Sequence, residues 1–256
     1  MILGSGDIGL IMARRMTLEG AKVLAVCEIM PYSSGLKRNI AQCLDDFCIP
    51  LYLEHTIVEI KGKERVESVV IAQVDKEKKP IPGTEREIPC DTVLFSVGLI
   101  PENELTKETG LALDPHTKGC FVDENRETDV SGIFACGNVL HVHDLIDFVS
   151  EEAEVAGRAA AEYLINGDSE HVYIPTVAGE NVGYVLPQRA GKGKDIKLYF
   201  RVRSAFRNAV IRVEAGEMVK TYKRIAVAPG EMENITIKAA DFADAQSIRV
   251  SVTREA

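Results

Sequence analysis

Gly4-Ser5-Gly6-Asp7-Ile8-Gly9 stands near the start of the chain and carries the spacing G-x-G-x-x-G. The apolar residues Ile2 and Leu3 precede it, and apolar side chains recur after it at positions 8, 11, 12 and 16. This pattern predicts a strand, a tight turn and a helix. The backbone amides and the dipole at the start of such a helix favour phosphate. The motif therefore predicts a Rossmann unit that holds the pyrophosphate of a dinucleotide.

We assign the whole stretch Gly4–Gly9 to cofactor binding. In such a turn Gly4 permits the bend, Gly6 lets phosphate approach the backbone, and Gly9 lets the helix pack on the strand. Asp7 stabilises the helix dipole but must point away from an anionic pyrophosphate. The alternative is a doubly wound domain in which the glycines only shape a turn.

A carboxylate stands where the ribose of the dinucleotide is expected. The apolar stretch 22–27 is predicted to be the second strand, and it ends at Glu28, 19 positions after Gly9. An acid at this distance accepts hydrogen bonds from both ribose hydroxyls and repels the extra phosphate of NADP. Residues 29–32, which follow, include no Arg or Lys. The sequence therefore favours NAD(H).

The composition indicates a folded chain that is long enough for two domains. Of the 256 residues, 46% are hydrophobic and 27% are charged, as in globular proteins. No apolar run approaches the roughly 20 residues of a membrane span, and no signal peptide is visible in the given sequence, so we expect a cytoplasmic location. The six cysteines form no C-x-x-C pair and no zinc spacing, so we expect reduced thiols. Because the chain begins inside a predicted strand, we expect a longer protein with sequence ahead of Met1.

The middle of the chain is predicted to return to the sheet. Residues 51–59 and 65–74 have the composition of strands in a β-meander. The apolar run 91–98 is predicted to be a central strand that ends at Gly98, where a ligand could lie against the backbone. The alternative for Gly98 is a structural turn.

A second glycine motif follows later in the chain. We expect a short buried strand over 132–138 that ends in Gly137-Asn138, and then a helix over 145–165. This helix carries a stripe of small residues that would permit close packing on a sheet: Ala153, Ala156, Gly157 and Ala160.

Four motifs together resemble one family. They are Gly4–Gly9 with Glu28, D-T-V-L-F-S-V-G-L-I-P at 91–101, T-D-V-S-G-I-F-A-C-G-N at 128–138, and A-G-R-A-A at 156–160. Their order and spacing resemble those of the pyridine nucleotide-disulfide oxidoreductases over about residues 1–166. In that family an NAD(P)H domain is inserted into an FAD domain, and hydride passes from nicotinamide to flavin. The resemblance assigns residues 1–105 to the NAD(H)-binding domain, with Gly98 beside the nucleotide, and residues 106–168 to the C-terminal half of the FAD domain.

The chain departs from that family at two places. The family's first G-x-G-x-x-G, which holds the ADP half of FAD, is absent, so we expect the isolated chain to bind NAD(H), to bind FAD poorly and to be inactive. FAD is expected in the full-length protein. The family usually has Gly-Asp where this chain has Gly137-Asn138, and the aspartate bonds a ribityl hydroxyl of FAD. Asparagine can still accept that bond through its amide oxygen.

Directly after this motif comes His141-Val142-His143-Asp144, which the resemblance places at the pyrimidine edge of the flavin. Three interpretations stay open: a histidine, with His143 as the candidate, donates to flavin O2; the histidines and the acid ligate a metal; or the polarity is that of an ordinary loop. Two histidines without a third ligand make a poor site, so we predict no metal. Asp144 is expected to cap the following helix.

From about residue 181 the hydrophobic pattern changes to period two. Strands are expected over 196–203, 209–214, 218–225, 232–238 and 248–253. They predict a small antiparallel, immunoglobulin-like β-sandwich over 181–256. Residues 1–170 carry a net charge of −14 and residues 171–256 one of +5, which places a boundary within 166–180. The basic outer positions of these strands indicate a solvated face or an acidic partner, and without an aromatic stacking platform we expect no nucleic acid.

These observations support two functions from different classes. The first is the C-terminal part of an FAD-dependent NAD(P)H oxidoreductase that passes electrons to an unidentified acceptor. The alternative is a non-catalytic, NAD(H)-responsive interaction protein whose β module recruits a partner. No catalytic acid or base can be named. The expected partners are a nicotinamide dinucleotide and either a dehydrogenase subunit or a second copy of the chain.

Overall fold

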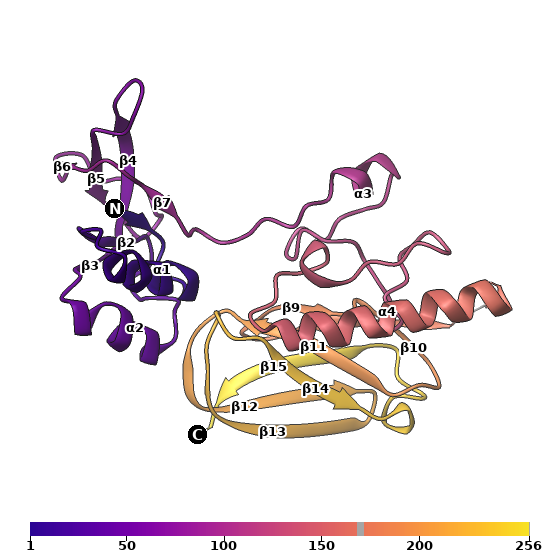
Figure 1. The fold of residues 1–256 in the computed structure, drawn as a ribbon. Helices are drawn as coiled ribbons and strands as arrows, with labels where there is room; N and C mark the ends of the chain where they lie inside the picture. Colours follow the sequence, from indigo (N-terminus) through magenta and orange to yellow (C-terminus); the bar gives the residue numbers. More distant parts are fainter. Residues whose placement is uncertain (168–171, 256) are drawn as a thin grey trace. The chain divides into compact units, whose positions relative to one another are not determined.

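The computed structural model describes residues 1–167 and 172–255, and the chain forms two compact units, Met1–Gly98 and Leu99–Ala256. Figure 1 shows that each unit has its own helices and sheets. Within the described residues, no helix has the length and apolar character needed to cross a membrane.

A four-stranded parallel sheet lies at the centre of the first unit. Its strands, in spatial order, are β3 (Leu51–Leu53), β2 (Val26–Glu28), β1 (Ile2–Leu3) and β7 (Leu94–Phe95). Helix α1 (Asp7–Leu18) follows β1 across the glycine turn. Helix α2 (Lys37–Cys43) and the 3-10 helix η1 (Asp45–Phe47) follow β2. The predicted order of strand, turn, helix and strand is confirmed.

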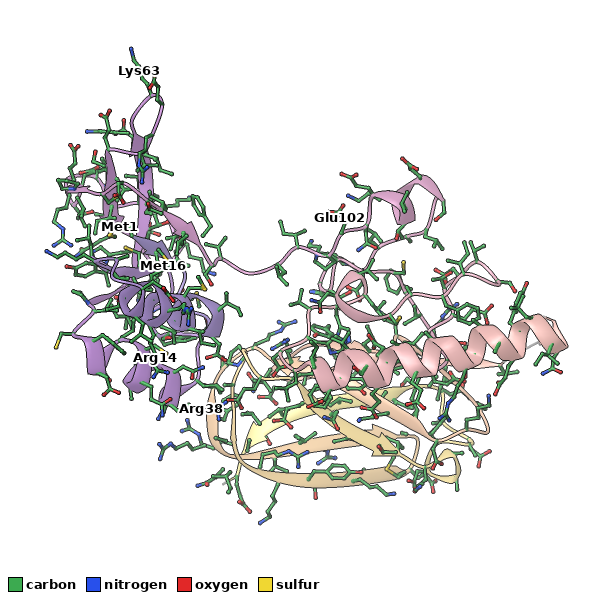
Figure 2. All side chains as sticks on the ribbon, viewed as in Figure 1. Met1, Arg14, Met16, Arg38, Lys63 and Glu102 are labelled. Atoms are coloured by element: carbon green, nitrogen blue, oxygen red, sulfur yellow. The ribbon has the colours of Figure 1, made fainter. Side chains whose placement is uncertain are left out.

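The two faces of this sheet are covered by different elements. Alternate strand residues face opposite sides, so Ile2 and Val26 pack with Leu10 of α1. Cys27 faces the other side and packs with Val69, which belongs to an antiparallel sheet. That sheet consists of β4 (His55–Lys61), β5 (Ser68–Gln73) and β6 (Arg86–Pro89). Figure 2 shows Lys63 at the tip of the turn that joins β4 and β5.

Two predicted strands of this unit differ in the structure. Residues 51–59 do not form one strand, because Glu54 adopts a left-handed φ of 54° that separates β3 from β4 and lets β3 join the parallel sheet. The run 91–98 is not central. It contributes only β7, at the edge of the sheet, where Phe95 is 62% exposed because no described strand pairs with its outer side.

The second unit begins with loops and a long helix. Up to residue 145 it contains only the short helix α3 (Glu104–Glu108) and the 3-10 helix η2 (Gly137–Val139), followed by α4 (Ile146–Asn166). The predicted helix over 145–165 is confirmed. The buried strand expected over 132–138 is not: Phe134 forms an isolated bridge with Glu127, and residues 133–136 are only half-buried. A parallel strand needs neighbours on its edges, and no described strand lies beside this segment.

The rest of the second unit is a β-sandwich. One sheet has the order β10-β8-β15-β12-β13 and the other β14-β11-β9. The strands are β8 (Tyr173–Ala178), β9 (Val182–Leu186), β10 (Arg189–Gly191), β11 (Ile196–Val202), β12 (Phe206–Ala215), β13 (Met218–Val227), β14 (Glu233–Ile237) and β15 (Ile248–Arg254). Alternate residues of β11, such as Leu198 and Phe200, lie in the core between the sheets. The predicted sandwich is confirmed, although β8 and β15 pair in parallel.

The division of the chain differs from the predicted three domains. The first unit ends at Gly98 rather than near residue 105, and residues 106–167 share one unit with the β-sandwich. The sandwich begins at Tyr173 rather than near residue 181. Residues 168–171 of the predicted boundary, including the domain end at 168, lie outside the described residues.

Candidate functional site

The glycine turn lies at the carboxyl end of β1, directly before α1. Gly4 has a left-handed φ of 100°, and a Cβ atom added there would lie 2.0 Å from the carbonyl oxygen of Ser96. A Cβ atom at Gly6 would instead meet only the hydroxyl of Ser34, at 3.6 Å. Space beside the Gly6 backbone is therefore open at the end of the helix that favours phosphate.

Glu28 is tied to this turn by hydrogen bonds. Glu28 is 6% exposed, and its Oε2 accepts bonds from the amide of Ser5 at 3.0 Å and from the hydroxyl of Ser5 at 2.5 Å. Its Oε1 accepts the amide of Met30 at 3.0 Å. Since a carboxylate offers about four acceptor positions, one position remains, on Oε1. The two bonds from ribose hydroxyls to Glu28 stay a prediction, and the bonds within the chain leave one acceptor position for them.

Asp7 points away from the turn, as expected. Its Oδ1 accepts the amide of Leu36 at 2.8 Å and the side-chain amide of Asn39 at 2.7 Å, both at the start of α2. The loop ahead of α2 also contacts the turn, because the Ser33 hydroxyl and the Gly35 amide donate to the carbonyl of Ser5 at 2.9 and 3.0 Å. Sequence reasoning missed this loop, whose signal is two serines and a glycine directly after the acid-bearing strand.

The other predicted residues of the first unit lie near the same edge of the sheet. The side chain of Ile8 is 68% exposed. Gly98 has a φ of 94°, and a Cβ atom there would meet nothing within 4 Å. A hollow lined by Met16 and Lys22 lies instead at the amino ends of β1 and β2. Ligands of open parallel sheets bind at the carboxyl ends of the strands, so the glycine turn is the better candidate.

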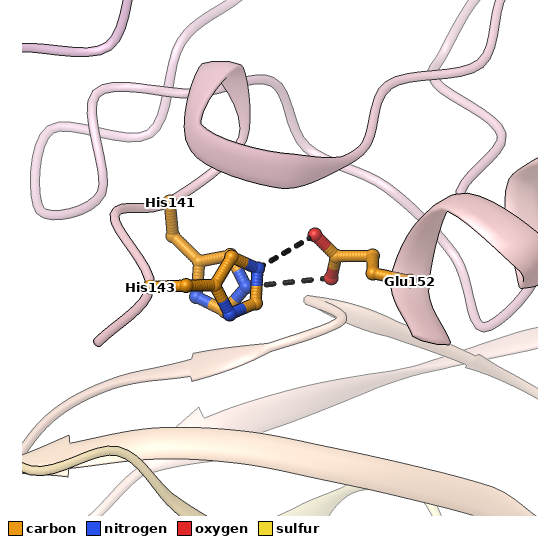
Figure 3. Close-up of side chains that lie close together, drawn as sticks. All are labelled: His141, His143 and Glu152. Atoms are coloured by element: carbon orange, nitrogen blue, oxygen red, sulfur yellow. Dashed lines mark hydrogen bonds and ion pairs between the residues drawn. The ribbon is translucent and has the colours of Figure 1, made fainter. Parts of the chain in front are cut away.

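The second candidate site is centred on Glu152 of α4, which is fully buried. Figure 3 shows its carboxylate facing the rings of His141 and His143. Oε1 accepts bonds from Arg126 Nε at 2.9 Å and His141 Nε2 at 3.3 Å. Oε2 accepts bonds from the amide of Gly137 at 2.7 Å and from His143 Nε2 at 3.0 Å. We call Arg126, His141, His143 and Glu152 the Glu152 cluster. Through the bond to the Gly137 amide, this cluster supports the Gly137-Asn138 turn.

Arg126 neutralises the charge of Glu152 inside the cluster. Burial alone would raise the pKa of Glu152, but the bonds from His141 and His143 and the charge of Arg126 outweigh it and hold the pKa well below its usual range. Burial lowers the pKa of His141, although Glu152 opposes this, so the ring is neutral near pH 7. The nitrogens of the two histidines and a Glu152 oxygen lie within 4.8 Å of one another, as metal ligands would. Because Arg126 already neutralises the carboxylate and each oxygen accepts two bonds, the arrangement favours an ion pair over a metal site.

Asn138 and His143 are linked through the loop. Asn138 is exposed, and its Oδ1 accepts the backbone amide of His143 at 3.1 Å. The ring of His143 turns inward onto Glu152, and its side chain is only 1% exposed. A contact between this ring and flavin O2 therefore stays a prediction that the observed conformation does not favour.

Asp144 does not cap α4. The helix begins after Leu145 without a side-chain cap, and Asp144 Oδ2 accepts the amide of Met232 in the sandwich at 3.0 Å instead. Sequence reasoning also missed Glu152, whose signal was an acid four positions before Ala156. The buried face of α4 contains Glu152 and Ala156, whereas Ala153 and Gly157 are exposed.

Comparison with known proteins identifies relatives of this arrangement. The model of the pyridine nucleotide-disulphide oxidoreductase family matches residues 1–162. The chain is 24% identical over 227 residues to an NAD(P)H sulfur oxidoreductase (CoA-dependent) of Pyrococcus abyssi, covering 83% of this chain and 47% of that protein. It is 30% identical over 144 residues to a dihydrolipoyl dehydrogenase of Pseudomonas aeruginosa, covering 54% of this chain and 28% of the relative. The chain thus spans about half the length of these curated relatives, or less.

Solved structures show the same similarity. Thioredoxin reductase from T. acidophilum matches with a TM-score of 0.56 and 26% identity, over 64% of this chain and 52% of that one. An FAD-dependent pyridine nucleotide-disulphide oxidoreductase from Desulfovibrio vulgaris matches over 93% of this chain and 60% of that one, with a TM-score of 0.50. At 18% identity, the latter similarity concerns the fold alone.

Proposed function

Because this chain belongs to the pyridine nucleotide-disulphide oxidoreductase family, whose members use FAD and NAD(P)H, we propose that it binds NAD(H) and contributes one half of an FAD site to a flavin-dependent oxidoreductase. On this proposal the isolated chain is inactive, and the complete enzyme passes electrons to an acceptor that is not identified. A nicotinamide coenzyme would supply hydride, which flavin would accept. No side chain described above is assigned a catalytic role.

The geometry of the glycine turn carries the NAD(H) assignment. The residues present fit a dinucleotide, because the space beside the Gly6 backbone is open at the start of α1, whereas Gly4 is packed against Ser96. Within the turn, the amides at the start of α1 would hold the pyrophosphate. The remaining acceptor position on Glu28 would hold one ribose hydroxyl. Gly98 would lie against the nucleotide, since nothing fills the space beside it.

The residues after β7 fit one half of a flavin site. Asn138 is exposed on a turn whose glycine, Gly137, has a left-handed φ of 72° and donates its amide to Glu152. We assign Asn138 to the ribityl chain, where its amide oxygen keeps an acceptor position beside the bond from His143. His143 and Glu152 then support the turn.

The decisive test fills the open space at Gly6. Its φ of −64° and ψ of 167° are accessible to any residue, and the nearest atom to an added Cβ is at ordinary contact distance. The variant Gly6→Ala should therefore fold normally but place a methyl group where the phosphate approaches. We expect calorimetric titration to show NADH binding weakened by more than about tenfold, which corresponds to about 1.4 kcal/mol.

The matched control is Gly157→Ala. Gly157 lies on an exposed part of α4, and a Cβ atom there meets nothing within 4 Å, so this variant should bind NADH like the wild type. Equal NADH affinity of both variants and the wild type, or no NADH binding by the wild-type chain, would refute the assignment.

A further inference from the structure

The β-sandwich contacts the loop that follows the Gly137-Asn138 turn at three positions. Tyr184 of β9 lies with its hydroxyl 3.2 Å from His141 Nδ1. Arg201 of β11 donates to the carbonyl oxygen of Val142 at 2.9 Å. Asp144 accepts the amide of Met232, just before β14, at 3.0 Å. Two strands and one turn of the sandwich therefore hold the loop His141–Asp144, which we call the histidine loop.

Arg201 has the central place among these contacts. Its side chain is 18% exposed, and Nη2 lies 3.6 Å from Asp144 Oδ1 in addition to its bond with Val142. Its Nη1 donates to the carbonyl of Pro229 at 3.2 Å, in the connection between β13 and β14. A planar guanidinium with several fixed donors can join two backbone segments in one geometry, so Arg201 fixes the histidine loop to the sandwich.

The direction of the hydrogen bonds at His141 extends this connection. An ionised carboxylate only accepts, so His141 must donate to Glu152 from Nε2. In a neutral ring Nδ1 is then an acceptor, and the hydroxyl of Tyr184 donates to it. Glu152 thus sets the tautomer of His141, and the Tyr184 hydroxyl, which also lies 3.7 Å from Met232 Sδ, matches that tautomer from the side of the sandwich.

An aromatic contact from the outer face of β11, opposite the sandwich core, supports the same loop. Tyr199 of β11 is 1% exposed, and its ring centroid lies 6.0 Å from that of His141 and 6.2 Å from that of His143, both edge-on. Its hydroxyl donates to Glu151 of α4 at 2.9 Å. The two histidines are therefore packed between Glu152 on one side and the sandwich on the other.

The loop in turn sets the orientation of Asn138. The backbone amide of His143 donates to Asn138 Oδ1 at 3.1 Å, so a shift of the loop would release that side chain. The order of contacts runs from Arg201 to Val142, along the backbone to His143, and from there to Asn138. Each link is a hydrogen bond or a peptide bond.

We propose that the β-sandwich is a structural wall of the flavin half-site, in which Arg201 acts as a positioning residue that orients Asn138 through the histidine loop. This rests on the proposed function, because it takes Asn138 as a flavin ligand. On this proposal the β-sandwich supports the cofactor site of its own chain. The alternative from the sequence was that it recruits a partner.

The test uses the full chain and three variants. Arg201→Met removes the donors, and Arg201→Lys keeps a cation that can reach Val142. Arg212→Met is the control, since Arg212 lies on β12 and its side chain bonds only that of Glu214 among the contacts described. Two properties are measured by NMR: amide hydrogen exchange of residues 138–147, and the shift of the Asn138 side-chain amide signals during titration with FAD, which detects weak binding.

We expect Arg201→Met to speed exchange of the loop amides and to weaken FAD binding, each by about tenfold or more, with exchange of the β15 amides unchanged. Arg201→Lys should restore most of both properties, and Arg212→Met should match the wild type. If Arg201 had only a structural role, Arg201→Met would change the exchange rates of the loop amides but leave the FAD affinity unchanged. That result would overturn the proposal. Identical behaviour of Arg201→Met and Arg212→Met would overturn it as well.

Failure of the proposed function has a different signature. If FAD at millimolar concentration moves no signal of the wild-type chain, the flavin assignment of Asn138 is wrong and the proposal falls with it. The exchange data then still show whether Arg201 holds the loop, so the two failures are distinguishable.

Discussion

Replacing Arg126 by methionine should strongly destabilise the second unit. The side chain of Arg126 is 3% exposed and that of Glu152 is 0% exposed, so Arg126→Met leaves a buried carboxylate without its cation. Breaking a buried ion pair in this way costs about 3–5 kcal/mol. His141, His143 and the Gly137 amide keep their bonds to Glu152, which favours the lower end of that range.

The matched control is Arg158→Met on the same helix. Arg158 pairs with Glu154 one turn away, but the two side chains are 76% and 60% exposed, and such pairs contribute about 0–1 kcal/mol. The assay is urea unfolding, monitored through hydrogen exchange of the backbone amides of α4 and β11. This readout reports on the second unit alone, which is needed because the two compact units need not unfold together. If Arg126→Met were no more destabilising than Arg158→Met, the reasoning about this ion pair would be refuted.

The same cluster predicts how stability depends on pH. Glu152 has a pKa below its ordinary value of 4.5 in the folded chain, so its contribution is present above that pH and is lost as the pH falls through the folded value. His141 has a pKa below its ordinary value of 6.5, so its burial as a neutral ring costs stability increasingly below pH 6.5. Both effects have the same sign, and the stability of the second unit should fall as the pH is lowered from about 6.5. Stability that is constant between pH 7 and pH 4 would contradict this.

Two further predictions concern the first unit. Exposed Cys48 should react with a thiol reagent well before Cys27, which is buried and whose pKa burial raises to about 11; simultaneous reaction of the two, monitored by mass spectrometry, would contradict this burial. Glu28→Gln should weaken NADH binding by about tenfold and NADPH binding less, because a neutral amide loses the ribose acceptor but no longer repels a phosphate. The control in calorimetric titrations is Glu19→Gln, which alters only an exposed pair with Arg15, and equal losses for both coenzymes would argue against the role of Glu28.

Local pattern was enough to predict the parts of this protein that depend on neighbouring residues in the chain. The G-x-G-x-x-G spacing predicted the turn between β1 and α1, because the left-handed φ of Gly4 and the exposed amides of a helix start are local properties. The alternation of β11 predicted the sandwich for the same reason: a strand that is buried on one face shows period two wherever it lies.

The roles of the polar residues depended on contacts between distant segments. The carboxylate of Glu28 is mostly occupied by Ser5, 23 positions earlier, and no periodicity shows that. Glu152 accepts hydrogen bonds from residues that lie 26, 11, 9 and 15 positions away: Arg126, His141, His143 and Gly137. These residues come together only because α4 packs against the Gly137 turn. The loss of the predicted strand over 132–138 has the same origin, since strand formation depends on a pairing partner as well as on composition.

Sequence by itself thus determined the fold class and the place of the glycine turn, because both follow from the conformational and periodic properties of short segments. Tertiary structure alone decided that Asp144 and Arg201 join the β-sandwich to the histidine loop and that Glu152 lies buried beside Arg126. A charged side chain has the same local signature whether it faces solvent or an ion-pair partner, and only folding brings the partner within reach.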